Sequence, residues 1–261
     1  MKTYETILYE KDGGVATITL NRPEVLNAIN MKMHHELMEA FISAEKDRDI
    51  RVVVLTGKGR AFCPGADLKE ISEIFTDPER QKAFYQNLPG TFDVIISFPK
   101  PIIGAINGVA TAGGLELVLC CDIVVASEEA RIGDAHANFV GVGPLFCSLA
   151  PRKMAFMKAV EMALTGDIWT ARECEKAGLV NYVVPPDELG AKVREIAAKL
   201  TGKMPLGSKA IKTVIRQTLA GSPDSALKVA YREQEAVGQS KDHAEGLRAF
   251  AEKRKPVFTG E

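Results

Sequence analysis

Hydrophobic and polar residues alternate in patterns that predict strands and helices in regular succession over the first half of the chain. Two β-rich runs flank the Asp-Gly-Gly turn at residues 12–14, which predicts an opening hairpin. Residues 31–47 place apolar side chains at helical spacing and predict an amphipathic helix. The continuous apolar run at 51–57 is typical of a strand buried on both faces of a parallel sheet.

The same order then repeats. Residues 78–97 read as a helix, 101–108 as a strand, 113–119 as a helix and 122–127 as a strand. Strands that alternate with helices predict an α/β fold in which helices cross over between parallel strands. From about residue 151 the pattern becomes mostly helical, and only residues 179–184 are expected to form a strand there.

Composition and charge exclude several classes of protein. Hydrophobic residues make up 46% and charged residues 26% of the chain, as in ordinary soluble globular proteins. With 33 Lys and Arg against 34 Asp and Glu, the net charge of −1 gives no general attraction to nucleic acid or to an anionic membrane. The first residues lack the pattern of a signal peptide, and no apolar stretch is long enough to cross a bilayer. We therefore expect a cytoplasmic protein.

Familiar catalytic and metal-binding motifs are missing from the sequence. The five cysteines follow neither a disulfide framework nor a CxxC metal site, and the adjacent Cys120 and Cys121 are expected to be buried packing residues. The stretch at 108–114 is not a GxGxxG dinucleotide fingerprint. The chain also lacks the GxSxG elbow of a serine nucleophile. No metal and no separate cofactor are expected.

Two glycine-containing turns are the remaining candidates for a catalytic or binding site. "GRAFCPGADLKE" follows the strand at 51–57, and "GVATAGGLEL" follows the strand at 101–108. Ligands of α/β sheets bind at the carboxyl ends of strands, so both turns can face one crevice. Each turn begins a helix, whose free N–H groups and positive dipole end suit a developing oxyanion.

Glu116 is the candidate acid or base beside the second turn. It lies three residues after Gly113 and so returns to the same helix face within one turn. The alternative is a carboxylate that merely stabilises a helix N-terminus through the dipole. The flanking sequence "GGLELVLCC" is too apolar for a solvated helix face, which favours the catalytic interpretation.

Segments spread over nearly the whole chain resemble the crotonase, or enoyl-CoA hydratase/isomerase, superfamily. They occur in the expected order: "NRPEVLNAI", "VVLTGKGRAFCPGADLKE", "KPIIGAINGVATAGGLELVLCCDIVVAS", "ALTGDIWTARECEKAGLVNYVV" and "EGLRAFAEKRKPVF". The resemblance implies a spiral α/β core of ββα units over residues 1–195. It also implies a helical C-terminal region, 196–261, that serves oligomerisation or acts as a lid, and assembly into trimers or dimers of trimers.

The same resemblance implies an acyl-CoA substrate whose thioester oxygen is bound by the backbone N–H groups of Ala66 and Gly113. Coenzyme A would then be part of the substrate. The residues implied to contact the substrate or its CoA moiety are Glu24, Val25, Leu26, Ala66, Asp67, Leu68, Lys69 and Gly113.

One position departs from the family pattern. Typical hydratases of the family carry a second Glu in the stretch that matches "ARIGDAHANFVGVGP", and His136 stands at the matching position. Histidine exchanges protons near neutral pH, so Glu116 and His136 form a workable acid/base pair. In the alternatives, His136 only lines the pocket while Glu116 acts alone, or Asp134 acts directly. Asp134 would otherwise be expected to bond to local backbone.

The sequence therefore predicts an enoyl-CoA hydratase-like lyase that adds water to a 2-enoyl-CoA thioester or catalyses the reverse dehydration. The alternative is an isomerase, hydrolase or decarboxylase of the same family. A non-catalytic acyl-CoA-binding or RNA-binding relative is the third class considered. The presence of Glu116 argues against a silent binder, and the balanced charge gives no support to RNA binding.

Overall fold

The computed structural model describes residues 3–261 and, within this range, all side chains except those at positions 85 and 87–89. Its larger sheet has six strands in the order β1-β2-β3-β5-β7-β10. The strands β1 and β2 form the expected antiparallel hairpin, and the other neighbours pair in parallel. The strand bounds are β1 (Ile7–Asp12), β2 (Val15–Leu20), β3 (Val52–Gly57), β5 (Ile102–Ile106), β7 (Ile123–Ser127) and β10 (Tyr182–Val184).

A smaller sheet of four short strands lies beside the larger one. Its order is β4 (Ala61–Cys63), β6 (Val109–Thr111), β8 (Arg131–Gly133) and β9 (Ile168–Thr170). The first three are parallel, and β9 pairs antiparallel with β8. The chain passes from the large sheet to the small one three times, from β3 to β4, β5 to β6 and β7 to β8, and each passage ends in helices. This alternation confirms a spiral of ββα units.

Helices begin where side chains cap them. The caps at Asn30, Asp67, Asp77, Thr170 and Ser222 each accept a hydrogen bond from a backbone N–H in the first helical turn. The core helices are α1 (Met31–Lys46), α2 (Leu68–Ile74), α3 (Pro78–Ser97), α4 (Gly113–Cys120), α5 (Pro144–Lys153), α6 (Phe156–Thr165), α7 (Ala171–Lys176) and α8 (Leu189–Thr201). No helix formed by residues 3–261 is both long and apolar enough to cross a membrane.

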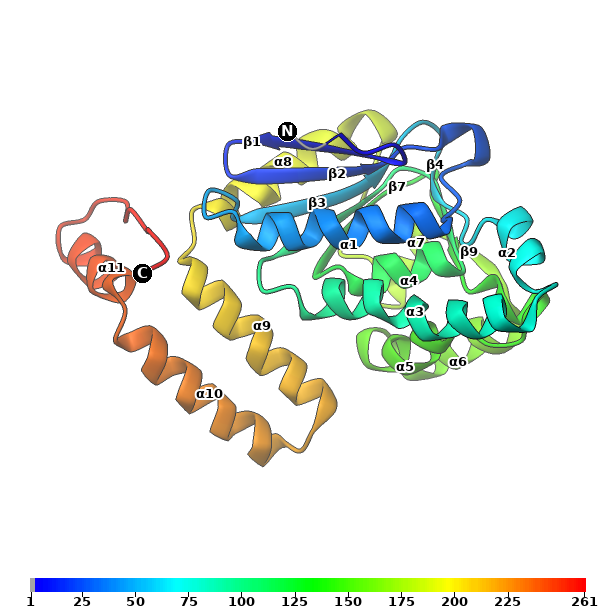
Figure 1. Ribbon diagram of the computed structural model, residues 1–261. Helices are drawn as coiled ribbons and strands as arrows, with labels where there is room; N and C mark the ends of the chain where they lie inside the picture. The colour runs from blue at the N-terminus through cyan, green and yellow to red at the C-terminus, as the bar shows by residue number, and fades with distance from the viewer. Residues whose placement is uncertain (1–2) are drawn as a thin grey trace.

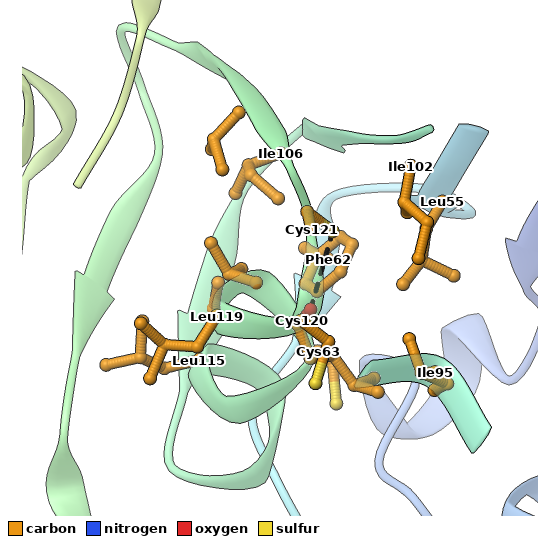
Figure 2. Packing of buried hydrophobic residues seen from close by; sticks show 14 of the residues in the cluster. Leu55, Phe62, Cys63, Ile95, Ile102, Ile106, Leu115, Leu119, Cys120 and Cys121 are labelled. Atoms are coloured by element: carbon orange, nitrogen blue, oxygen red, sulfur yellow. Dashed lines mark hydrogen bonds between the residues drawn. The ribbon is translucent and has the colours of Figure 1, made fainter. Parts of the chain in front are cut away.

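The large sheet is buried on both faces, which explains the continuous apolar runs of its strands. Val53 and Leu55 face the main core with α1, whereas Val52 and Val54 face α8 on the opposite side (Figure 1). Figure 2 shows Cys63 and Cys120 within the main core, between Ile95 of α3 on one side and the leucines of α4 on the other. Each fully buried aliphatic side chain contributes roughly 1.5–3 kcal/mol.

The C-terminal third differs from its expected form in two respects. It contains two strands, β9 and β10, where one was expected, because the three-residue β9 is too short to produce a periodic pattern. The expected boundary at residue 195 falls inside α8, whose Ile196 and Ala197 still pack on the large sheet. The helices α9 (Pro205–Ala220), α10 (Pro223–Gly238) and α11 (Lys241–Ala251) follow. Lys212 and Arg216 of α9 hydrogen-bond to the core, whereas α10 lies farther from the two sheets (Figure 1).

Candidate active site

The ends of three neighbouring parallel strands of the small sheet bring the candidate site residues together. Ala66 follows β4, Gly113 follows β6, and both Asp134 and His136 follow β8. Because parallel strands point the same way, their carboxyl ends meet at one edge of the sheet. The sheet edge that carries the two glycine-containing turns therefore also carries the turn after β8.

The two proposed N–H donors lie on backbone turns that touch each other. A methyl group placed on Gly113 would lie 3.6 Å from the Gly65 Cα atom and 3.8 Å from the Ala66 nitrogen. The Ile29 N–H donates to the Gly65 carbonyl (2.8 Å), and the Asp67 N–H donates to the Ile29 carbonyl (2.8 Å). Among residues 3–261, the N–H groups of Ala66 and Gly113 have no hydrogen-bond acceptor. They are free to bind a ligand oxygen.

Close packing at Gly114 fixes the position of α4. A methyl group placed there would lie 2.0 Å from the Cys63 carbonyl oxygen, so only glycine lets the first turn of α4 approach β4 this closely. Just before this turn, Ala112 has a φ of 48° and a ψ of −121°, a conformation that is unusual for a residue with a side chain. The backbone is thus held in an unfavourable conformation next to Gly113.

Arg22 joins the two segments that were expected to contact CoA. Its Nη1 atom lies 2.9 Å from Asp67 Oδ2 and also donates to the Ala28 carbonyl (2.7 Å). Burial raises the pKa of Asp67, but the Arg22 hydrogen bond and the N–H groups at the start of α2 outweigh burial and lower it. Glu24 and Val25 lie exposed on the 3₁₀ turn η1 (Pro23–Val25).

The other residues that were expected to contact CoA lie on both sides of the Arg22–Asp67 ion pair. Leu26 has a left-handed backbone (φ 57°) directly after η1, while Leu68 and Lys69 are exposed on the first turn of α2. The sequence analysis missed Arg22. The Asn-Arg-Pro triplet showed a cation before a turn, but its pairing with Asp67 appears only in the folded chain.

Glu116 is buried, with 5% of its surface exposed, and has two specific partners. Its Oε1 atom accepts hydrogen bonds from the N–H groups of Leu145 (3.0 Å) and Phe146 (3.3 Å) in the first turn of α5. Burial raises the pKa of Glu116, and the positive charge of His136 and the two N–H groups only partly oppose it. A carboxyl group whose pKa is raised and which is held rigidly is suited to exchange protons.

His136 lies on the 3₁₀ turn η2 (Ala135–Asn138), and its Nδ1 atom is hydrogen-bonded to Asp134 Oδ1. Burial lowers the pKa of His136, but the hydrogen bond and charge of Asp134, together with the charge of Glu116, raise it overall. The imidazolium form is therefore retained to a higher pH than in a free histidine. Asp134 bonds a side chain here, instead of the local backbone that its turn position suggested.

Cys63, Cys120 and Cys121 of the core are buried. Burial raises the pKa of Cys63 to about 12, and Cys120 and Cys121 are equally enclosed, as expected for packing residues. Unreactive thiols of this kind are structural. In the described part of the chain, no three His, Cys, Asp or Glu side chains are grouped so that they could hold a metal ion.

Comparison with known proteins agrees with the fold. The sequence model of the enoyl-CoA hydratase/isomerase family matches residues 10–261. A probable enoyl-CoA hydratase of Mycobacterium tuberculosis is 34% identical over 260 residues, covering 98% of this chain and 99% of that protein. A 1,2-epoxyphenylacetyl-CoA isomerase of Escherichia coli is 35% identical over 264 residues, with 98% and 99% covered.

Solved structures show the same likeness. The crystal structure of an enoyl-CoA hydratase from Bacillus anthracis superposes with a TM-score of 0.93 at 32% identity, covering 98% of this chain and 100% of that one. The two-sheet spiral and these relatives define an enzyme of the crotonase fold. The chain belongs to the enoyl-CoA hydratase/isomerase family, with hydratase-like function.

Proposed function

We propose that this enzyme adds water across the double bond of a 2-enoyl-CoA thioester and also catalyses the reverse dehydration. The observation that carries the proposal is that two free N–H groups, at Ala66 and Gly113, the buried Glu116 and the partly buried His136 lie at one edge of the small sheet. The hydratase names of several relatives support the choice of reaction.

The two N–H groups supply electrostatic stabilisation. Attack at the β-carbon moves electrons through the conjugated system and places negative charge on the thioester oxygen. Two fixed donors at Ala66 and Gly113 stabilise that charge without reorganising, and losing one such donor commonly lowers the rate by about 10²–10³-fold.

Glu116 and His136 divide the movement of protons. The Glu116 carboxylate accepts a proton from water while the hydroxyl oxygen bonds to the β-carbon. The His136 imidazolium then donates its proton to the α-carbon of the enolate, which completes the hydrated product. Transfer of the proton from Glu116 to the neutral imidazole restores both groups, and the proposal is supported by the effect that the charge of each side chain has on the pKa of the other.

Substrate contacts and assembly complete the proposal. The CoA moiety lies along the two exposed segments that Arg22 joins, which contain Glu24, Val25, Leu26, Asp67, Leu68 and Lys69. The helices beyond α8 leave apolar side chains such as Ile211, Tyr231 and Phe250 exposed, which supports subunit contacts in a trimer or a dimer of trimers. Sedimentation at micromolar concentration tests this assembly, and a stable monomer contradicts it.

The decisive experiment offers a panel of 2-enoyl-CoA thioesters to the purified enzyme. Hydration removes the conjugated absorbance and adds the mass of one water, which becomes labelled in H₂¹⁸O. Glu116→Gln and His136→Ala should each lower hydration by about 10²-fold or more, while acyl-CoA binding changes far less. Glu188→Gln, on the exposed turn η3 (Pro186–Glu188), is the matched control and should keep full activity. Double-bond migration without incorporation of labelled oxygen would establish the isomerase instead.

A further inference from the structure

Gly143 lies so close to the Asp134 and His136 pair that any side chain would displace it. Its backbone, with φ −93° and ψ 102°, is one that every residue adopts, so glycine is not needed for conformation. A methyl group placed on it would lie 2.4 Å from His136 Nδ1 and 3.0 Å from Asp134 Oδ1. The missing side chain therefore leaves the space that this side-chain pair occupies.

We propose that Asp134 is a positioning residue, which holds His136 through Nδ1 so that Nε2 is the atom that delivers the proton, and that Gly143 provides the space for this arrangement. The inference rests on the proposed function. It adds a residue that acts through His136 and does not touch the substrate, and it assigns the reacting nitrogen.

Burial and hydrogen-bonding chemistry support this role. Asp134 is 1% exposed, and an ionised carboxylate so deeply buried needs a charged or strongly donating partner. The Nδ1 atom of His136 is the side-chain donor beside it. A carboxylate accepts only from a protonated nitrogen, so Nδ1 carries a proton and Nε2 is left to exchange one.

The other elements around the imidazole keep the roles separate. On α4, Glu116 Oε1 accepts from the N–H groups of α5, and the carboxylate bonded to Nδ1 is that of Asp134. On α5, burial and the charges of Asp134 and Glu116 raise the pKa of Cys147, which stays a neutral thiol. On α6, Lys158 and Glu161 pair with each other at the exposed surface (2.6 Å). The charges of Asp134 and Glu116 thus both favour the imidazolium form, whereas Asp134 alone orients the ring.

The test measures the ring nitrogens of His136 directly by ¹⁵N NMR, together with hydration of 2-butenoyl-CoA across pH. In the unmodified enzyme, Nδ1 should be protonated on both sides of the titration, and the titration midpoint should lie above 6.5. Asp134→Asn should lower that midpoint and reduce kcat near neutral pH by about 10-fold or more, with KM little changed. The upper limb of the pH profile should move to lower pH by the same amount as the midpoint.

Gly143→Ala is the second variant, because it disturbs the pair without changing a titratable group. It should lower the His136 midpoint and kcat in the same direction. The matched controls are Asp187→Asn on η3 and Gly238→Ala in α10, where an added methyl meets nothing within 4 Å, and both should leave midpoint and kcat unchanged.

The outcomes separate this inference from the proposed function. If Nδ1 is unprotonated in the neutral enzyme, or if Asp134→Asn leaves the His136 midpoint unchanged, the positioning role is refuted whatever the activity. If the midpoints move as expected but the unmodified enzyme hydrates no 2-enoyl-CoA, the pair stands and the proposed reaction is wrong.

Discussion

The adjacent glycines Gly113 and Gly114 should respond to the same substitution in opposite ways. At Gly114 an added methyl meets the Cys63 carbonyl oxygen at 2.0 Å, and neither atom is the mobile end of a side chain. The α4 helix must therefore move away from β4. Overpacking of this kind costs about 1–3 kcal/mol or more in the free energy of unfolding. For a chain of this size each kcal/mol lowers Tm by roughly 2–4 °C.

At Gly113 the nearest atoms to an added methyl are 3.6–3.8 Å away, which is ordinary contact. Alanine is also the better helix former, so the stability of Gly113→Ala should change by less than about 1 kcal/mol. The methyl would, however, occupy the space between the two turns whose N–H groups are proposed to bind the thioester oxygen. Displacing that oxygen from one donor should lower kcat by about 10²-fold.

Paired measurements on the two alanine variants test this reasoning. Chemical denaturation gives the free energy of unfolding, and steady-state hydration of 2-butenoyl-CoA gives kcat. We expect Gly114→Ala to be unstable and Gly113→Ala to be stable but nearly inactive. A Gly113→Ala enzyme with full activity would show that the space beside it is not where the thioester oxygen binds. An unaltered Tm for Gly114→Ala would show that α4 and β4 are less tightly packed than described.

Two further perturbations extend the test. Ala66→Pro removes an N–H that no described residue uses, so turnover should fall by about 10²-fold while the circular dichroism spectrum is kept, and full activity would mean that the donor is misassigned. Burial lowers the pKa of His34 to about 4, so the folded state binds fewer protons than the unfolded state as pH falls below 6.5. Stability should drop by about 3 kcal/mol between pH 6.5 and 4, and His34→Leu should remove that slope in urea titrations at each pH; an unchanged slope would assign the acid sensitivity elsewhere.

The elements with strong local signals agree closely between sequence and structure. The helix expected at 78–97 is α3, which begins after the Asp77 cap with Pro78 in its first position. In the same way, α10 begins after the Ser222 cap with Pro223 in its first position. Buried parallel strands such as β3 and β5 were recognisable because both faces are apolar and leave no polar alternation.

The small sheet and the contacts at the site could not be predicted in the same way. Three-residue strands such as β9 are too short to show an alternation of apolar and polar residues. Their pairing depends on strands that are distant in sequence. The sequence made Glu116 and His136 candidates, but their hydrogen-bond partners could be found only in the folded structure. The N–H groups that hold Glu116 belong to α5, 29 and 30 residues further along the chain. Asp134 and His136 are two residues apart. Their side chains can bond because the chain turns at η2, which begins directly after Asp134.

The order of the strand ends in the small sheet has a consequence for how new activities can arise. In the proposed site, the thioester donors and Glu116 follow β4 and β6, whereas His136 and Asp134 follow β8, so the histidine's part of the proton chemistry is encoded by a peptide segment separate from the donors. Mutation within residues 134–143 can then vary the proton chemistry while the thioester cradle stays intact. Such a layout favours evolutionary divergence and directed evolution, because a library confined to one loop samples reactions without first losing the substrate.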